Sequence, residues 1–237
     1  MISVLLLPKL FSMKLRTSLF CSILFFLAAV SFSQNSEKAK RYHTAKLFEK
    51  QFELLHTKLA VRLDFEKEEL EGEAWLDLSP HFYSTDKLIL DAKAMLIHEV
   101  SSEKKHLDFH YDGTKIYIDL ERVYKKGDSL KLYLSYTARP NKVNQSGSKA
   151  IAGAKGLYFV NSKGDSNGKP TQVWTQGATE ASSCWFPTID KPNQKTSQEI
   201  HIRVPEKYKT LSNGVLVSQT PIANKERIDY WKMDQKH

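Results

Sequence analysis

Residues 130–136 read Leu-Lys-Leu-Tyr-Leu-Ser-Tyr, the clearest alternating pattern in the chain. Leu130, Leu132, Leu134 and Tyr136 fall on one side of the alternation, and more polar residues fall on the other. A period of two is the spacing at which a β-strand turns every second side chain to the same face of a sheet. The stretch therefore predicts a half-buried strand rather than a helix.

The same period recurs on both sides of this stretch. An upstream strand carries Leu55, Leu59, Val61, Leu63 and Phe65 on one face. Further strands are expected over residues 70–78, 87–90, 94–100, 107–111, 116–120, 157–160, 200–204, 215–217 and 230–233. Turns are expected at Asp112-Gly113, a type I′ hairpin sequence, and at residues 125–128. About ten short strands without a long helix predict an all-β fold, a saddle-like antiparallel β-sandwich.

One segment, Trp174–Pro192 (WTQGATEASSCWFPTIDKP), departs from this alternation and shows neither a strand nor a helix period. It holds two of the four tryptophans and two prolines. A loop with so many apolar residues cannot be solvated on all sides, so we expect it to pack against the fold. It would then hold Gln176 and Glu180 in fixed positions.

The first residues are typical of a secretory signal peptide. Lys9, Lys14 and Arg16 precede an apolar run at residues 19–30, and small residues follow up to Ser33. The run is shorter than the roughly 20 residues that span a bilayer. We therefore expect a signal peptide over residues 1–33, a flexible linker over 34–41, one domain over 42–237, and a secreted or periplasmic protein with no membrane span in its mature chain.

Net charge and cysteine content limit the binding partners and the covalent links that we expect. Removing the three leader cations from the net charge of +8 leaves +5, spread over the sequence without a block of like charges. Such a distribution does not favour a nucleic-acid partner. Cys184 is the single cysteine outside the leader, so an internal disulfide is not expected in the mature chain, and this thiol fits a packed small side chain.

Motifs for hydrolytic chemistry are incomplete. His98-Glu99 lacks the second histidine of an H-E-x-x-H zinc motif. His106 and His110 are four residues apart in a strand-like segment, about 13 Å and too far for one metal ion. A G-x-S-x-G nucleophile sequence is absent as well. No catalytic residue and no metal site are therefore predicted within this chain.

Three ordered motifs resemble one family. These are Thr175-Gln176-Gly177 followed by Phe186-Pro187 and Asp190-Lys191-Pro192, then Val-Pro-x-x-Tyr-x-x-Leu-Ser-Asn-Gly at residues 204–214, then Trp-Lys-Met-Asp-Gln at residues 231–235. Over residues 42–237 the chain resembles the N-terminal domain of the aminopeptidase N-like zinc metallopeptidases. The resemblance implies a saddle-shaped β domain packed against a separate catalytic domain that holds zinc.

In that family a T-Q-x-E loop reaches the active site, and its glutamate receives the α-ammonium group at the N-terminus of a peptide substrate. By this resemblance Gln176 matches the family glutamine, Ala178 stands where the glutamate belongs, and Glu180 is the candidate replacement. The zinc helix would lie beyond residue 237. The resemblance therefore implies a domain incomplete at its C-terminal end, with no cofactor of its own and no turnover alone.

Two other functions stay open at this point. A free-standing secreted β-sandwich could bind peptides or glycans through the aromatic residues Trp174 and Trp185. A pseudo-enzyme subunit could instead dock onto a separate catalytic chain. The aminopeptidase hypothesis predicts an exposed apolar docking face of several hundred Å², whereas the free-standing module predicts none.

Overall fold

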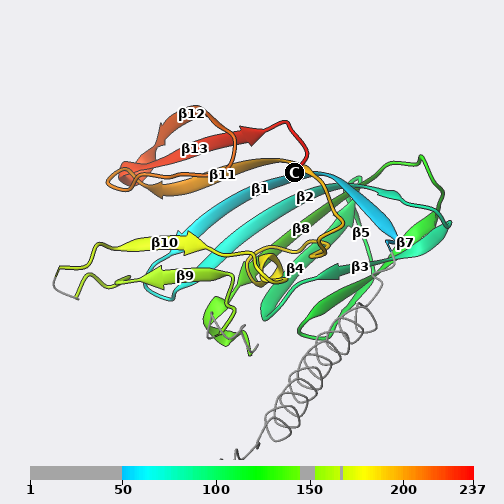
Figure 1. Ribbon diagram of the computed structural model, residues 1–237, viewed down its shortest axis with the longest axis horizontal. Coiled ribbons are helices and arrows are strands. Elements are labelled where there is room, and N and C mark those ends of the chain that lie inside the picture. Colours follow the sequence, from blue (N-terminus) through cyan, green and yellow to red (C-terminus); the bar gives the residue numbers. More distant parts are fainter. Residues whose placement is uncertain (1–49, 145–152, 166–167) are drawn as a thin grey trace, which may run out of the picture. The chain divides into compact units, whose positions relative to one another are not determined.

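Thirteen β-strands and three short 3-10 helices form the part of the chain that the structure describes, residues 50–144, 153–165 and 168–237 of a computed structural model (Figure 1). The expected signal peptide (1–33), the expected linker (34–41) and the first residues of the expected domain (42–49) lie outside the described residues. Within those ranges the all-β prediction is confirmed. No helix there has the length and apolar character needed to cross a bilayer.

Eight strands form the large sheet, in the spatial order β12-β13-β11-β1-β2-β8-β4-β5. In chain order they are β1 (Phe52–Asp64), β2 (Glu69–Pro80), β4 (Met95–Ser102), β5 (Lys105–His106), β8 (Leu130–Ala138), β11 (Ser197–Pro205), β12 (Val215–Ile222) and β13 (Glu226–Met233). The pairs are antiparallel except that β1 and β11 run parallel. This departs from a purely antiparallel sandwich. A long connection between β1 and β11 lets both strands begin at the same end of the sheet, as parallel pairing requires.

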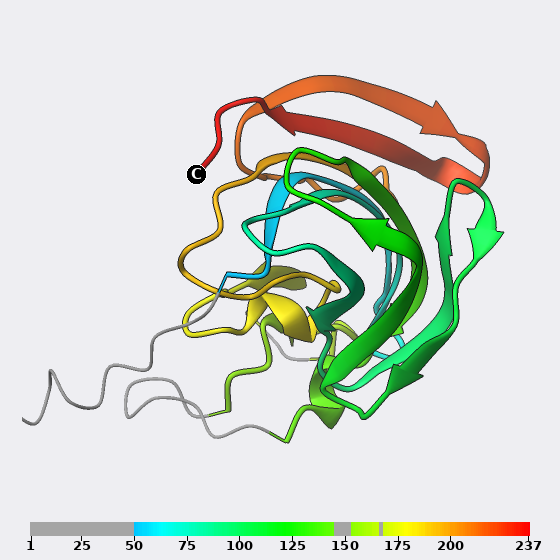
Figure 2. The same cartoon turned by 90° about the vertical axis from the view of Figure 1, so that its right-hand side faces the viewer.

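Two smaller sheets complete the fold. One contains β3 (Thr85–Asp91), β7 (Lys115–Tyr124) and β6 (Phe109–Tyr111). The other is the hairpin of β9 (Leu157–Val160) and β10 (Gln172–Thr175). Figure 2 shows the large sheet curling around this hairpin and around the segment that follows it. The short helices are η1 (Pro140–Lys142), η2 (Ser182–Cys184) and η3 (Ala223–Lys225).

The inner face of the large sheet carries the core. The four inward residues of 130–136 are at most 1% exposed, as are Leu70, Leu76 and Leu78 of β2. They pack in one cluster with Leu88 and Leu90 of β3 and with Ile116 and Ile118 of β7. Burying an aliphatic side chain contributes about 1.5–3 kcal/mol. The core therefore lies between the large sheet and the smaller ones.

Local geometry differs from the sequence expectation in β1. A bulge between Leu54 and His56 shifts the alternation by one residue. Phe52 and Leu54 are buried before it, Thr57 and Leu59 are buried after it, and Leu55 is only half-buried. A bulge leaves one residue unpaired and so changes the phase of a strand. Leu55 is thus not part of the inward face on which a strict period placed it.

Two further details are corrected. The expected hairpin joins β6 to β7, but among its turn residues only Gly113 has positive φ, at 91°. A type I′ turn needs two such residues, so this turn is not of that type. Trp174 and Thr175 belong to strand β10, although the sequence showed no strand period from residue 174 onward.

Candidate functional site

The sequence T-Q-G-A-T-E begins at the last residue of β10 and runs into the segment that follows; we call residues 175–186 the arm. Strand β10 is held by β9, where Tyr158 stacks on Trp174 with ring centroids 4.3 Å apart. The N–H of Gln176 donates to the carbonyl of Gly156 at 2.9 Å, which extends the ladder by one residue into the arm. The position of Gln176 is therefore set by the hairpin.

Gly156 permits the arm to lie against the hairpin. Its φ is +71°, and a Cβ at this position would lie 2.0 Å from the carbonyl oxygen of Ala181 and 2.8 Å from Cβ of Cys184. Only glycine tolerates both the left-handed backbone and this approach. The hairpin and the arm therefore touch backbone to backbone.

A second set of contacts ties the arm to the end of β3. The N–H of Lys93 donates to the carbonyl of Ser183 at 2.7 Å, and its ammonium donates to the carbonyl of Glu180. The N–H of Ser183 donates to a carboxylate oxygen of Asp190 at 2.8 Å. Burial raises the pKa of Asp190, and the hydrogen bonds from Ser183 oppose that rise. The arm is thus fixed at both ends.

The interior of the arm is packed. Cys184 is fully buried and is a free thiol. Burial raises its pKa to about 11, so the thiol is protonated at neutral pH and unsuited to act as a nucleophile. Cys184 therefore fills space in the fold, as the sequence predicts for it.

The structure places the three predicted site residues in different surroundings. Gln176 is half-buried, and Ala178 is exposed. The carboxylate of Glu180 lies 3.0 Å from the ammonium of Lys191, with a side chain 38% exposed. A substrate ammonium at Glu180 would compete with Lys191 for this carboxylate. The Lys191 contact is the feature that the sequence alone could not supply.

A groove of about 880 Å³ opens beside the arm. Its floor is the inner face of β1 and β11, and Thr175, Gly177, Trp185 and Phe186 form one wall. Gln176 and Glu180 do not line it. Trp174 on the rim is 43% exposed. The arm therefore bounds a groove whose floor is apolar and whose walls also carry polar side chains, Gln198 and Lys207 among them.

The opposite wall is the loop 206–213, which stands on a buried ion pair. Asp229 is 0% exposed and lies 2.7 Å from Nε of Arg227. Arg227 also donates to the carbonyls of Glu206 and Tyr208, and Thr210 donates to Asp229 at 2.6 Å. The hydrogen bonds to Asp229 outweigh its burial, so its pKa lies below 3.8. Sequence reasoning missed Asp229, although it shares the phase of buried Trp231.

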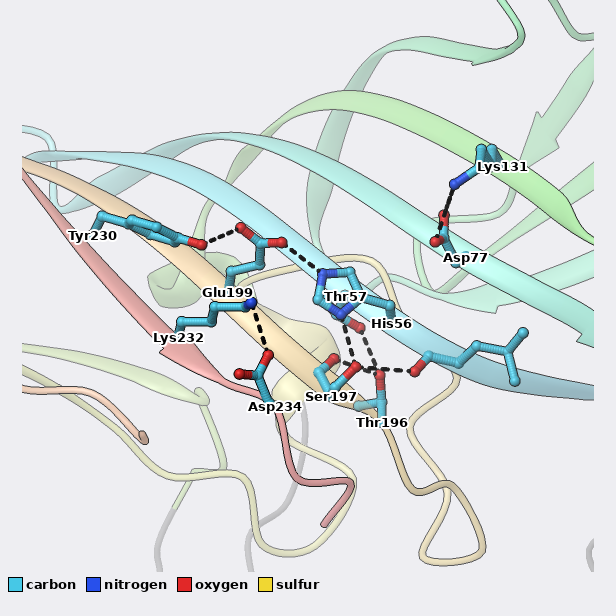
Figure 3. Close-up of polar contacts among 11 residues, drawn as sticks. His56, Thr57, Asp77, Lys131, Thr196, Ser197, Glu199, Tyr230, Lys232 and Asp234 are labelled. Atoms are coloured by element: carbon cyan, nitrogen blue, oxygen red, sulfur yellow. Dashed lines mark hydrogen bonds and ion pairs between the residues drawn. The ribbon is translucent and has the colours of Figure 1, made fainter. Parts of the chain in front are cut away.

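A polar cluster on the outer face joins the two halves of the large sheet (Figure 3). His56 of β1 lies 3.0 Å from a carboxylate oxygen of Glu199 of β11 and 2.8 Å from the hydroxyl of Ser197. Tyr230 of β13 donates to the other oxygen of Glu199 at 2.8 Å. Burial raises the pKa of Glu199, but these hydrogen bonds outweigh it, and the pKa falls below 4.5. The cluster spans the parallel seam.

A zinc site does not fit the described residues. Across residues 50–144, 153–165 and 168–237, no group of three or more histidine, cysteine, aspartate or glutamate side chains is arranged to hold a metal ion. His106 and His110 also belong to separate strands, β5 and β6. A structural or catalytic zinc ion needs at least three protein ligands.

Comparison with solved structures gives the same fold in zinc peptidases. The M1 zinc metallopeptidase from Deinococcus radiodurans matches with a TM-score of 0.63 and 14% identity over 81% of this chain. Leukotriene A4 hydrolase from Saccharomyces cerevisiae matches with a TM-score of 0.58 and 20% identity over 78% of it. The chain spans 41% of the first structure and 27% of the second. At such identities the likeness shows the fold alone.

Sequence comparison identifies the family. No curated protein sequence matches the chain. The family model for the peptidase M1 N-terminal domain matches residues 53–237, which include every strand of the described fold except the first residue of β1. The chain therefore belongs to the peptidase M1 N-terminal domain family.

Proposed function

We propose that this chain is the N-terminal, cleft-forming domain of an exported zinc aminopeptidase. The family match over residues 53–237 carries the proposal. The related fold in M1 zinc metallopeptidases supports it, and one such structure holds a Tyr-Ser-Ala substrate. In this proposal a zinc ion would be held by residues outside the described part, and it would supply the Lewis-acid chemistry for peptide hydrolysis. The domain itself supplies a wall of the substrate cleft.

The groove beside the arm is the surface that we assign to docking of the catalytic part. Its floor holds apolar side chains from β1 and β11, its walls include polar side chains such as Gln198, and its rims expose Trp174 and, at 87%, Leu211. A groove of about 880 Å³ with exposed apolar side chains on its rims is typical of a surface that receives another part of a protein. This observation favours the aminopeptidase domain over a free-standing peptide or glycan module.

The arm sets how strongly the substrate amine is held. A carboxylate in a partly dry cleft binds an ammonium group and fixes the first peptide bond near the reacting centre. Ala178 offers no such group, and the carboxylate of Glu180 already contacts Lys191. The proposed enzyme would therefore bind free N-termini more weakly than a relative with glutamate at this position.

The test uses the protein isolated under native conditions from its source. Zinc and hydrolysis of aminoacyl anilides should accompany it, and a chelator should abolish the hydrolysis. Ala178→Glu should raise kcat/KM for peptides with a free N-terminus about tenfold or more relative to N-acetylated peptides, because a charge-assisted hydrogen bond contributes about 1.5–3 kcal/mol. Ala178→Gln is the matched control without the charge.

Two results would contradict this proposal. Native material without zinc and without aminopeptidase activity would overturn the proposed function. If Ala178→Glu and Ala178→Gln changed kcat/KM equally, the assignment of the arm to the substrate amine would be wrong.

A further inference from the structure

A second hollow, of about 610 Å³, opens on the outer face of the large sheet. Side chains from five neighbouring strands, β11, β1, β2, β8 and β4, line it together with the turn after β4. They alternate along these strands with buried side chains of the core, for example Trp75 with Leu76 and Lys131 with Leu130. The volume is that of a site for a small or extended ligand.

Two half-buried aromatic rings belong to this lining. Trp75 and Tyr133 are paired directly across β2 and β8, and their ring centroids lie 5.4 Å apart. The hydroxyl of Tyr133 donates to the carboxylate of Glu73 at 2.6 Å, which fixes the Tyr133 ring. On β1 the ammonium of Lys58 lies 5.2 Å from the centre of the Trp75 ring. Such a contact is weak near solvent, so the flexible Lys58 side chain can move aside for a ligand that packs on the ring.

Charged groups of both signs surround the two rings. Asp77 and Lys131 form an ion pair at 3.2 Å (Figure 3). His56 lies 3.0 Å from a carboxylate oxygen of Glu199. Besides this histidine the lining holds four carboxylates and three ammonium groups, those of Asp77, Glu99, Glu103, Glu199, Lys58, Lys104 and Lys131. A polyanion such as nucleic acid needs an excess of cations, which this near balance does not offer. The hollow suits a ligand without net charge.

We propose that this hollow binds a neutral oligosaccharide. A pyranose ring has a face of C–H groups that packs on an aromatic ring, and a rim of hydroxyls that both donate and accept hydrogen bonds. Carboxylates accept and ammonium groups donate, and each has capacity for more than one partner. The lining places both kinds of group beside Trp75 and Tyr133. A lipid would instead need a mainly apolar lining, because burying these charges under an acyl chain is costly.

The hollow is separate from the groove beside the arm. Leu59 of β1 lines the groove, whereas Lys58, one residue earlier, lines the hollow. Successive side chains of a strand point to opposite faces of the sheet. Sugar binding therefore does not rest on the proposed peptidase function. It is expected to be weak, because the sugar hydroxyls must share groups that already contact one another, such as Asp77 and Lys131.

Isothermal titration calorimetry of the full chain with cellohexaose, chitohexaose and mannohexaose tests the proposal, and a blocked glycine-serine hexapeptide serves as the peptide probe. At least one of the three oligosaccharides should bind. Trp75→Ala should weaken that binding about tenfold or more, because it removes the ring on which the sugar packs. Tyr83→Ala is the matched control: Tyr83 is an aromatic residue outside the hollow, 78% exposed, and its substitution should leave the binding unchanged.

A second variant guards against a folding defect in Trp75→Ala. The side chain of Lys131 is 70% exposed, so Lys131→Met should fold normally and still weaken the binding about threefold, because a hydrogen-bond donor is lost. If none of the three oligosaccharides bound at millimolar concentration, the proposal would be wrong. Binding of the hexapeptide alone, lost in Trp75→Ala, would also overturn it, since the hollow would then be a peptide site. So would sugar binding that Trp174→Ala abolishes and Trp75→Ala does not, since the site would then lie at β10.

Discussion

The close approach at Gly156 yields a quantitative prediction. Gly156 and Gly153 share a φ of +71°, but a Cβ on Gly153 would meet nothing within 4 Å. Gly153→Ala therefore measures the cost of a left-handed alanine alone, about 1–2 kcal/mol before the gain from a stiffer unfolded chain. The difference between the two alanine variants isolates the steric contact between hairpin and arm.

The steric part follows from the distance. A Cβ at 2.0 Å from the carbonyl of Ala181 must move away by about 1 Å to reach ordinary contact. That carbonyl accepts the hydrogen bond from Cys184 N–H, at 3.2 Å, which begins η2. Overpacking costs about 1–3 kcal/mol and a lost hydrogen bond about 1 kcal/mol. The free energy of unfolding of Gly156→Ala should therefore be about 2–4 kcal/mol lower than that of Gly153→Ala.

Urea unfolding followed by tryptophan fluorescence and far-UV circular dichroism measures this difference. With a slope near 2 kcal/mol per molar, the midpoint of Gly156→Ala should lie about 1–2 M below that of Gly153→Ala. Limited proteolysis should also cut within residues 177–186 sooner in Gly156→Ala. If the two midpoints coincided at equal slopes, the hairpin and the arm would not be in the contact described.

Three further predictions concern the supports of the groove and the sheet. Asp229→Asn should lower the free energy of unfolding by about 3 kcal/mol, because it breaks a buried ion pair. Asp119 forms an exposed ion pair with a lysine, so Asp119→Asn should cause no measurable loss in the same urea titration. The pKa of Glu199 in the folded chain lies below its ordinary value of 4.5. The contribution of this carboxylate to the free energy of unfolding is therefore fully present above that pH and should be lost as the pH falls through the folded pKa. Glu199→Gln should make the slope of unfolding free energy against pH shallower in acid. Cys184 should react with iodoacetamide only after denaturation, as followed by mass spectrometry, and rapid alkylation of the folded chain would contradict its burial.

Most strands were predictable because their pattern is local. The alternation at residues 130–136 fixes the inward face of β8 without reference to any other part of the chain. The neighbours of each strand could not be predicted, since nothing in the sequence of β1 or β11 indicates that they pair in parallel. The bulge between Leu54 and His56 could not be predicted either. In the sequence Leu55 falls on the same side of the alternation as Leu59, so nothing marks the change of phase.

The candidate site was predictable only in part. The resemblance supplied Gln176, Ala178 and Glu180 as positions in a motif. It could not supply the ion pair between Glu180 and Lys191, because that contact depends on how the arm folds back on itself. Asp229 was missed for a related reason: a buried acid is recognisable only when its cationic partner and its hydroxyl donor are seen beside it.

The parallel pairing of β1 with β11 has a consequence for how the chain folds. His56 sits opposite Ser197, so the seam closes only after the intervening sequence has been made and arranged. Contacts between segments so distant slow folding, because the entropy of a long loop is lost before the pairing rewards it. During synthesis β1 can join β2 early, yet its other edge stays bare until β11 emerges. Until then, that edge can pair with another extended segment.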